Sequence, residues 1–266
     1  MANLEHLALL KSGAVRWTKW RENHPKIQPD LSNANLRGIN LRGRNLSITN
    51  LANADLGNAI LITANFEGAN LANADLTLAL LVEANLVAAN LSIANLRGAN
   101  LQGASLRAAN LIGADLRSVN LSNADLENVN LIGADLRGAN LIDANLSEAK
   151  LIRTNLAEAN LTEAHLNYAD LSHANLWNAS LIGALLYKAE LNQANLNEAY
   201  LHKAYLLGAN FSQAKLINAD LRWANLKGAN FTGANLTGAN LRGANLYKAI
   251  LTDTIILNTH SNNEKL

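Results

Sequence analysis

The chain has 266 residues, of which 49% are apolar but only 5% are aromatic and 16% are charged. Its 22 Lys and Arg residues and 21 Asp and Glu residues leave a formal charge of +1, which argues against a strongly basic nucleic-acid binder and against a strongly acidic mimic of nucleic acid. The absence of cysteine excludes disulfide scaffolds, thiol catalysis and Cys-based zinc sites. No segment has the basic start of a signal peptide or the length of a membrane span, so the sequence predicts a soluble, cytoplasmic protein without a membrane partner.

The segment before residue 31 differs from the rest of the chain and is predicted to be helical. Residues 3–23 carry leucines at helical spacing near their start, and the side chain of Asn3 can cap the first turn. Gly13 is expected to break or bend this helix. Pro25 is expected to end it, because the residue before a proline avoids the helical region.

From Leu31 to Leu251 every fifth residue is leucine, apart from Phe66, Phe211 and Phe231. Ala usually stands two residues earlier and Asn or Asp one residue earlier, so the unit A-(N/D)-L-x-x occurs 45 times in succession. With a period of five, successive leucines would spread around a helix and would alternate between the two faces of a strand. The chain must therefore turn a corner once per repeat to keep them together. The glycines agree, since 14 of the 16 stand two residues after the central position, where a turn with positive φ recruits glycine.

Outward-facing residues indicate how many repeats complete one coil. Arg97, Arg117 and Arg137 recur every 20 residues, and Asp115 and Asp135 keep the same step. Twenty residues are four repeats, so the sequence predicts a four-sided coil that is repeated about 11 times. Leu and Ala are expected to face inward, and the other three positions of each repeat are expected to face outward.

The tandem A(N/D)LXX motif resembles the pentapeptide repeat family, which implies an all-β solenoid: a right-handed quadrilateral β-helix, here with a short N-terminal α-helical cap. The expected organisation is a cap over residues 1–30, the β-helix over residues 31–257 and a C-terminal tail over residues 258–266. The N-terminal segment is similar to the extension on many bacterial members, cyanobacterial ones especially. The resemblance says little about function, because members range from proteins that protect or inhibit DNA gyrase to many with no known activity.

The N-terminal end of the solenoid needs a cover, because bare strand edges and core leucines would seed aggregation. Trp17 and Trp20 are predicted to form a hydrophobic plug on the first coil, and the alternative is a helix that binds a partner. Arg44 stands in an inward position near this end and must therefore be paired. Glu22 or Asp30 is the expected partner.

No second helix can be read at the C-terminal end, which offers three apolar residues and a short polar tail. The last coil is therefore expected to stay open. A contact through one open end closes on itself and stops at two copies, whereas two open ends would polymerise. The sequence predicts a homodimer through the C-terminal end, or else a tail that folds back as a cap.

Two groups of apolar residues face outward, where the repeat usually has polar residues. The first group is a candidate apolar patch that consists of Ile60, Ile62, Leu78, Leu80 and Val82. The second lies among outward aromatics that include Tyr168 and Trp177, and is a candidate protein-binding edge that consists of Leu185, Tyr187, Tyr200, Tyr205, Leu207 and Trp223. The alternative for both is that β-branched and aromatic pairs only stabilise stacked strands.

No arrangement of residues predicts catalysis, a metal site or a cofactor. Within the repeats, His165, His173 and His202 do not converge with carboxylates at the spacing of metal ligands. Pairs of acidic residues are frequent, but they lie on an open convex surface that has no cleft to shift a pKa. An enzyme is therefore not expected.

The favoured function is a rigid, non-enzymatic scaffold that presents its aromatic edge to an unknown protein partner. The first alternative, which the family resemblance implies, is a DNA-mimic-type modulator of DNA gyrase or topoisomerase. Mimicry needs a negative rod, but here Asp115 and Asp135 are interleaved with arginines. A nucleic-acid partner is not expected either, because no basic stripe stands apart from acids. The second alternative is a purely structural or stress-related protein.

Overall fold

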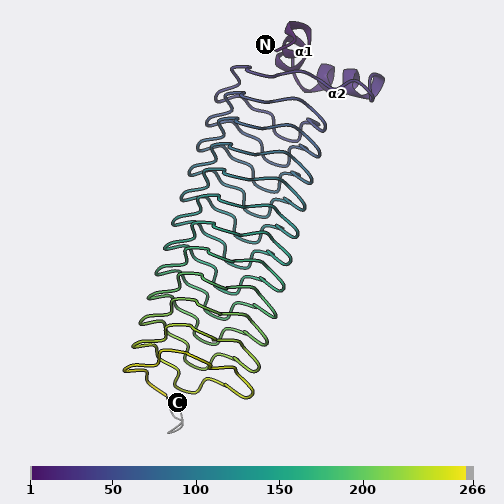
Figure 1. The fold of residues 1–266 in the computed structure, drawn as a ribbon. Helices are drawn as coiled ribbons and strands as arrows, with labels where there is room; N and C mark the ends of the chain where they lie inside the picture. The colour runs from purple at the N-terminus through teal and green to yellow at the C-terminus, as the bar shows by residue number, and fades with distance from the viewer. Residues whose placement is uncertain (1, 262–266) are drawn as a thin grey trace.

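The computed structural model describes residues 2–261, which form a right-handed, four-sided β-helix with two short helices at its N-terminal end (Figure 1). Helix α1 is Leu4–Lys11 and helix α2 is Ala14–Asn23. The fold class that the resemblance implied is confirmed. The two helices also confirm the prediction of helical structure with a break at Gly13, whose φ is 107°.

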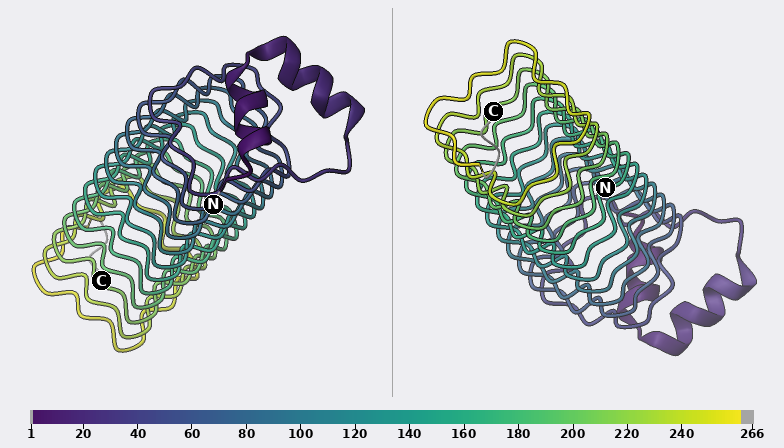
Figure 2. Two further views of the ribbon diagram at one scale, coloured as in Figure 1. Left: turned by 90° about the horizontal axis from the view of Figure 1, so that it is seen from above. Right: turned by 90° about the horizontal axis from the view of Figure 1, so that it is seen from below.

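Parallel pairing at a fixed step of 20 residues builds the rod. The pairs run without interruption from Asp30 with Asn50 to Asn240 with His260, so four repeats complete each coil as predicted. Figure 2, which looks along the rod, shows the resulting stack of similar outlines. The ladder continues past residue 257, where the repeats were expected to end, and residues 262–266 of the expected tail lie outside the described residues.

Four of the five backbone N–H groups of each repeat bond to backbone carbonyls. Around Leu96, for example, the N–H groups of Leu96 and Gly98 donate to the next coil at 2.7 and 3.0 Å, and Asn100 donates to the preceding coil at 2.9 Å. The N–H of Ala99 closes the corner by donating to the carbonyl of Leu96 at 3.0 Å. The corner therefore is a β-turn, and its third residue, Gly98, has a φ of 65°, as type II turns require.

The fifth N–H, one residue after the central leucine, depends on a side chain. That of Arg97 donates to Oδ1 of Asn95 at 3.2 Å, and the same bond recurs along the rod wherever Asn or Asp precedes the central residue. Asn side chains also stack from coil to coil, as when Nδ2 of Asn140 donates to Oδ1 of Asn120 at 3.2 Å. The Asn or Asp of the motif thus supplies an acceptor for a turn N–H that would otherwise have none. Leaving such a donor without a partner costs free energy where water is excluded.

The core is a column of leucines with alanines at the corners. Every central residue from Leu31 to Leu241 is buried, and Phe211 stacks on Phe231 with ring centroids 4.9 Å apart. The expectation that all 45 central residues are buried is wrong at the C-terminal end, where Leu246 and Leu251 are partly exposed. Within residues 2–261 no further coil stacks on them.

Single substitutions in the middle of the rod should separate the contribution of the core from that of the turn bond. Leu136→Ala should lower the free energy of unfolding by about 2–5 kcal/mol, because the narrow core cannot collapse around the cavity. Asn140→Ala should cost about 1 kcal/mol, because it removes the acceptor of the Ile142 N–H. Asn140→Asp keeps that acceptor but loses the donation from Nδ2 of Asn140 to Asn120, so it separates the contributions of the two bonds. Urea unfolding measures all three, and an equal loss for Leu136→Ala and Asn140→Ala would contradict the inside and outside assignment.

Candidate functional site

Outward aromatic residues gather on one side of the rod, which we call the aromatic side, formed by residues 165–168, 185–188 and 205–208. Leu185 pairs in the ladder with Tyr205 of the next coil. The rings of Tyr168 and Tyr187 meet edge to face with their centroids 5.2 Å apart. A shallow hollow of about 380 Å³, which we call the tyrosine hollow, is lined by Asn167, Tyr168, Leu185, Tyr187 and Tyr205.

On the side of the tyrosine hollow, the usual Asn or Asp before the central residue is missing in three successive coils, where His165, Leu185 and Tyr205 take its place. Where Leu185 takes this position, the turn N–H of Tyr187 donates instead to Oδ1 of Asn167 of the preceding coil, at 3.0 Å. Where Tyr205 takes it, the N–H of Leu207 has no acceptor within the described part of the chain. The hollow therefore combines apolar rings with a neighbouring backbone N–H that has no acceptor in the described part of the chain.

The structure divides the predicted protein-binding edge between two sides. Leu185, Tyr187 and Tyr205 line the tyrosine hollow, and Leu207 lies on the same side. Tyr200 and Trp223 lie on the neighbouring side, where Tyr200 pairs with Ser180 and Asp220, and Trp223 covers Gly243. Tyr168 and Asn167 belong to the hollow although the predicted edge omits them.

Cations accompany the aromatic side. Nζ of Lys188 lies 5.4 Å from the ring centroid of Tyr187. Farther toward the C-terminal end, Nζ of Lys227 and Nζ of Lys248 lie 5.6 and 5.4 Å from the centroid of Tyr247. Each ring face attracts a neighbouring ammonium group, so the aromatic side carries positive charge beside its apolar surface.

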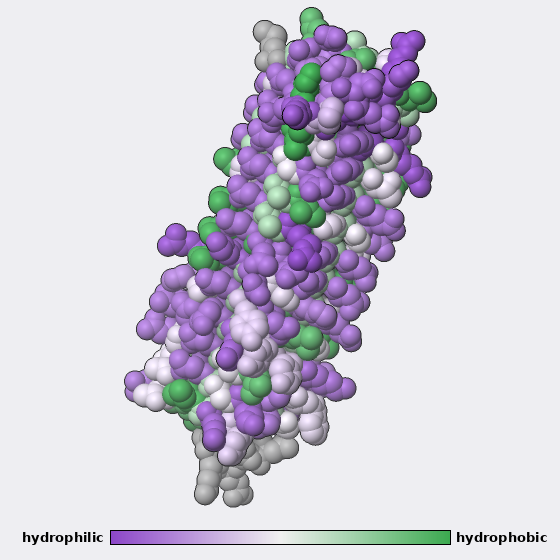
Figure 3. Space-filling view, turned by 90° about the vertical axis from the view of Figure 1, so that its right-hand side faces the viewer, coloured by the Kyte–Doolittle hydropathy of each residue, from purple (hydrophilic) through white to green (hydrophobic). Residues whose placement is uncertain are grey.

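In the candidate apolar patch near the N-terminal end, apolar residues again replace the usual Asn or Asp before the central leucine. Ile60 pairs with Leu80 in the ladder, and Leu78 at the adjacent corner is 54% exposed. Because Ile60 and Leu80 replace the usual Asn or Asp, the N–H groups of Ile62 and Val82 find no acceptor in the residues that the structure describes. Figure 3 shows that hydrophobic side chains form separate small groups on a largely hydrophilic face.

A charged ladder occupies another side of the rod. Arg97, Arg117 and Arg137 line a hollow of about 560 Å³, together with Trp177. Nε of Arg117 donates to Asp115 at 2.8 Å, and Nε of Arg137 donates to Asp135 at 2.9 Å. Asp115 and Asp135 therefore each accept hydrogen bonds from the arginine two residues later.

Helix α2 contacts the first coil through Trp17 and Arg21. The indole of Trp17 is fully buried, and its Nε1 donates to the carbonyl of Asn45 at 2.8 Å. Trp20 is half-buried beside it, with ring centroids 5.6 Å apart. The guanidinium of Arg21 donates to the carbonyl of Ser47 at 3.0 Å, and burial lowers the pKa of Arg21.

The expectation that Arg44 pairs with Glu22 or Asp30 is wrong. Its guanidinium donates to the carbonyl of Arg42 at 3.3 Å and lies within 4.0 Å of no described carboxylate. The inward position of Arg44 belongs to the first coil, above which no further coil closes the core. Arg44 is partly exposed there, and its Nε is buried without a hydrogen-bond partner.

Among residues 2–261 no group of three or more His, Cys, Asp or Glu side chains is placed to hold a metal ion, and this includes His165, His173 and His202. No helix in this part of the chain is long and apolar enough to cross a membrane.

Comparison with known proteins gives a consistent result for the repeats. The family model described as pentapeptide repeats matches in 8 copies, which together extend from residue 30 to residue 253. No curated protein matches the chain.

Among solved structures, the chain is similar to HetL, a pentapeptide repeat protein involved in heterocyst differentiation regulation from the cyanobacterium Nostoc sp. strain PCC 7120. The two are 34% identical over 91% of this chain and 95% of that chain, with a TM-score of 0.31. It is also similar to the pentapeptide repeat protein Rfr23 from the cyanobacterium Cyanothece 51142, with 32% identity over 46% of this chain and 91% of that chain and a TM-score of 0.24. QnrB1, a plasmid-mediated fluoroquinolone resistance protein, shares 19% identity over 64% of this chain and 90% of that chain, with a TM-score of 0.36.

The paired aspartates predict how stability depends on pH. Hydrogen bonds from Arg117, Arg137 and their counterpart at residue 222 lower the pKa of Asp115, Asp135 and Asp220. Because the folded pKa is lowered, this stabilisation is complete above about pH 4, the ordinary pKa of aspartate, and is lost as the pH falls through the folded values.

Urea unfolding at a series of pH values should therefore show a steeper loss of stability in acid for the wild type than for the triple variant Asp115→Asn/Asp135→Asn/Asp220→Asn. Asn keeps the acceptor of the turn N–H, so the variant removes the titrating charge together with the second carboxylate oxygen that each arginine contacts. Identical pH profiles for the two proteins would show that these ion pairs contribute nothing.

Proposed function

Because the chain belongs to the pentapeptide repeat family, we propose that this rigid scaffold binds a protein partner through the tyrosine hollow and does so without catalysing a reaction. The observation that carries the proposal is the replacement of the usual polar residue by Leu185 and Tyr205 in adjacent coils. Together with Tyr168 and Tyr187 they place one leucine and three tyrosines around a single hollow.

The chemistry of the tyrosine hollow fits a protein better than a small polar ligand. Tyrosine rings offer a large apolar area at a low cost in side-chain entropy, and their hydroxyl groups bond at the wet rim of an interface. The N–H of Leu207 adds a donor for a backbone carbonyl of the partner. Lys188 adds a positive charge at the edge.

The rigidity of the rod strengthens the proposal. Each coil bonds to both neighbours through its backbone, so the tyrosines stand on a surface that is ordered before a partner arrives. Binding then pays less for ordering the protein side of the interface. The ring pair of Tyr168 and Tyr187 holds both side chains in place.

Two other functions have less support. A DNA-mimic modulator of gyrase or topoisomerase needs unpaired negative charge along the rod, whereas Asp115, Asp135 and Asp220 each accept hydrogen bonds from arginine and the whole chain carries a charge of +1. A purely structural or stress-related role would leave the tyrosine hollow without a purpose.

The hollow is tested by the double variant Tyr187→Ser/Tyr205→Ser. Proteins captured from a native lysate by the immobilised chain should include at least one whose recovery falls more than tenfold with this variant, because both apolar walls of the hollow are lost. The matched control is Tyr200→Ser/Trp223→Ser, which removes two exposed aromatics from the neighbouring side and should capture the same protein as the wild type. The interaction is then measured with the purified partner by calorimetry.

Equal recovery of every protein with wild type, variant and control would contradict the proposal. A gyrase supercoiling assay and a duplex-DNA binding assay at physiological salt address the alternative. We expect no effect in either assay, and submicromolar activity would favour the DNA-mimic function.

We also propose that the C-terminal end mediates a homodimer. In the last coil Leu246, Leu251 and Ile256 are partly exposed, and their strand edges have no following coil within residues 2–261. Apolar side chains and open strand edges at one place are the composition of a self-association surface. A contact between two identical C-terminal ends about a twofold axis buries both surfaces, so association stops at two copies.

Light scattering after size exclusion tests the dimer. The wild type and a chain shortened after Ser261 should both be dimers, whereas Leu251→Arg should be a monomer with an unchanged circular dichroism spectrum. A wild type that is a monodisperse monomer would exclude the dimer. Aggregation of only the shortened chain would show instead that residues 262–266 act as a cap.

A further inference from the structure

The C-terminal coils carry a surplus of positive charge. Residues 199–250 contain six Lys and Arg residues and one Asp, whereas the rest of the chain contains more Asp and Glu than Lys and Arg. The one carboxylate, that of Asp220, accepts a hydrogen bond from Nε of Arg222 at 2.8 Å. The total charge of +1 therefore combines a basic C-terminal part with an acidic remainder.

Four exposed cations of these coils form no ion pair with a carboxylate among residues 2–261, namely Lys203, Lys227, Arg242 and Lys248. They stand on two neighbouring sides of the rod or at the corners where those sides end. Two exposed aromatic residues, Trp223 and Tyr247, stand among them. We call these six residues the basic face.

Trp223 is held at a corner with one face of its ring open. The ladder keeps its step of 20 residues here, so this corner lies between that of Lys203 in the preceding coil and that of Gly243 in the next coil. A Cβ on Gly243 would collide with the six-membered part of the indole, so the ring rests on the backbone there, next to Arg242. The side chain is nevertheless 62% exposed, which leaves the other face of the ring open to solvent.

Tyr247 lies one coil after Trp223, on the neighbouring side, and is 61% exposed. The ammonium groups of Lys227 and Lys248 lie 5.6 and 5.4 Å from the centroid of its ring. The basic face therefore presents exposed rings on two successive coils, with cations beside both rings.

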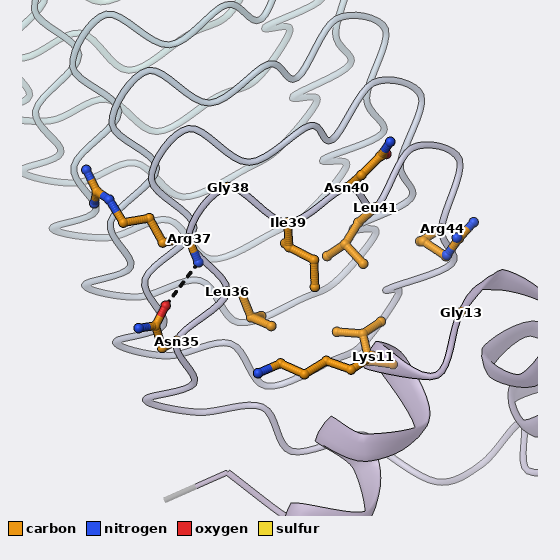
Figure 4. Close-up of a pocket in the computed structure, with 11 residues that line it drawn as sticks. Lys11, Gly13, Asn35, Leu36, Arg37, Gly38, Ile39, Asn40, Leu41 and Arg44 are labelled. Atoms are coloured by element: carbon orange, nitrogen blue, oxygen red, sulfur yellow. Dashed lines mark hydrogen bonds between the residues drawn. The ribbon is translucent and has the colours of Figure 1, made fainter.

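Cations at the N-terminal end are arranged differently. Lys11 and Arg44 line a hollow of about 590 Å³ between α1 and the first coil, and they form no ion pair with a described residue. Figure 4 shows their side chains pointing away from each other, and no aromatic residue lines this hollow. These two residues therefore supply a control for the effect of charge without rings.

We propose that the basic face binds single-stranded nucleic acid. Its four cations attract the phosphates, and the rings of Trp223 and Tyr247 stack on bases. The bases of a duplex are already stacked on one another, so a duplex can use only the cations. The proposal departs from the expectation of no nucleic-acid partner, because in these coils the free cations stand apart from acids.

A competing explanation is that the same cations bind an acidic segment of another protein. Such a segment gains from the four cations but offers no planar bases to Trp223 and Tyr247. Binding that depends on the bases of a strand as well as on its phosphates separates the two explanations.

The probe is a fluorescein-labelled oligothymidylate of about 15 nucleotides, a length within the site sizes of single-strand binders, whose binding to the full chain is followed by fluorescence anisotropy at physiological salt. An oligouridylate of the same length tests RNA. Three further probes of matched length are an abasic strand with the same phosphates, a duplex and polyglutamate. The wild type should bind at least one of the two oligonucleotides at least tenfold more tightly than each of these three.

The double variant Trp223→Ala/Tyr247→Ala should weaken binding of the oligonucleotide at least tenfold and leave its salt dependence unchanged. Lys203→Ala/Arg242→Ala should instead reduce the slope of log affinity against log salt by about 1.4, because each phosphate contact contributes about 0.7 for a single strand. Alanine already occupies the corner position of Trp223 at Ala88 and Ala108, so the fold should be retained, which circular dichroism checks.

Two controls match these variants. Lys11→Ala/Arg44→Ala removes the two cations of the N-terminal hollow, and Trp177→Ala removes an exposed ring that lies beside the arginines of the charged ladder. Both should bind the oligonucleotide like the wild type.

Three results would overturn the proposal: no binding of either oligonucleotide by the wild type, equal binding of the abasic strand, or unchanged binding by Trp223→Ala/Tyr247→Ala. Tighter binding of polyglutamate than of both oligonucleotides would also overturn it and would favour an acidic protein segment. None of these results bears on protein binding at the tyrosine hollow, whose residues are not part of the basic face.

Discussion

One backbone donor in each repeat constrains this protein more than any other group. The parallel ladder and the corner turn use four N–H groups of five and leave the one that follows the central leucine, such as that of Arg97. An Asn or Asp two residues earlier accepts it, and the amide side chains then bond from coil to coil, as Asn140 does with Asn120. The motif is thus the chemical solution to a hydrogen-bond deficit that its own turn creates.

Departures from that solution place apolar side chains on the outside of the rod at a few positions. Where Ile60, Leu80 and Tyr205 replace the polar residue, a turn donor loses its acceptor and an apolar side chain takes the exposed position. Where Leu185 does so, Asn167 of the preceding coil restores the bond. At these positions the loss of the bond and the gain of apolar surface have one cause.

The period of the sequence predicts the fold, the step of 20 residues and the side on which each outward residue lies, because the chain has no insertion that would shift the register. Contacts between coils are harder to predict. Tyr168 meets Tyr187 although they occupy different positions of their repeats, and Arg44 lacks the carboxylate expected for it. The cover of the first coil depends on how two helices pack on it, which no period encodes.

Because the chain turns by the same angle at each corner, the number of preceding repeats decides on which side of the rod a residue lies. This limits how such a chain can change in length. Adding one repeat of five residues would preserve the turn chemistry and the core, yet it would turn everything beyond the insertion by one side. Inserted between Leu185 and Tyr205, it would take apart the tyrosine hollow without disturbing a single leucine of the column. Adding four repeats would restore the original faces and only separate them by one coil. A surface built from several coils therefore keeps its composition only when the chain gains or loses repeats in steps of 20 residues, the step of the ladder.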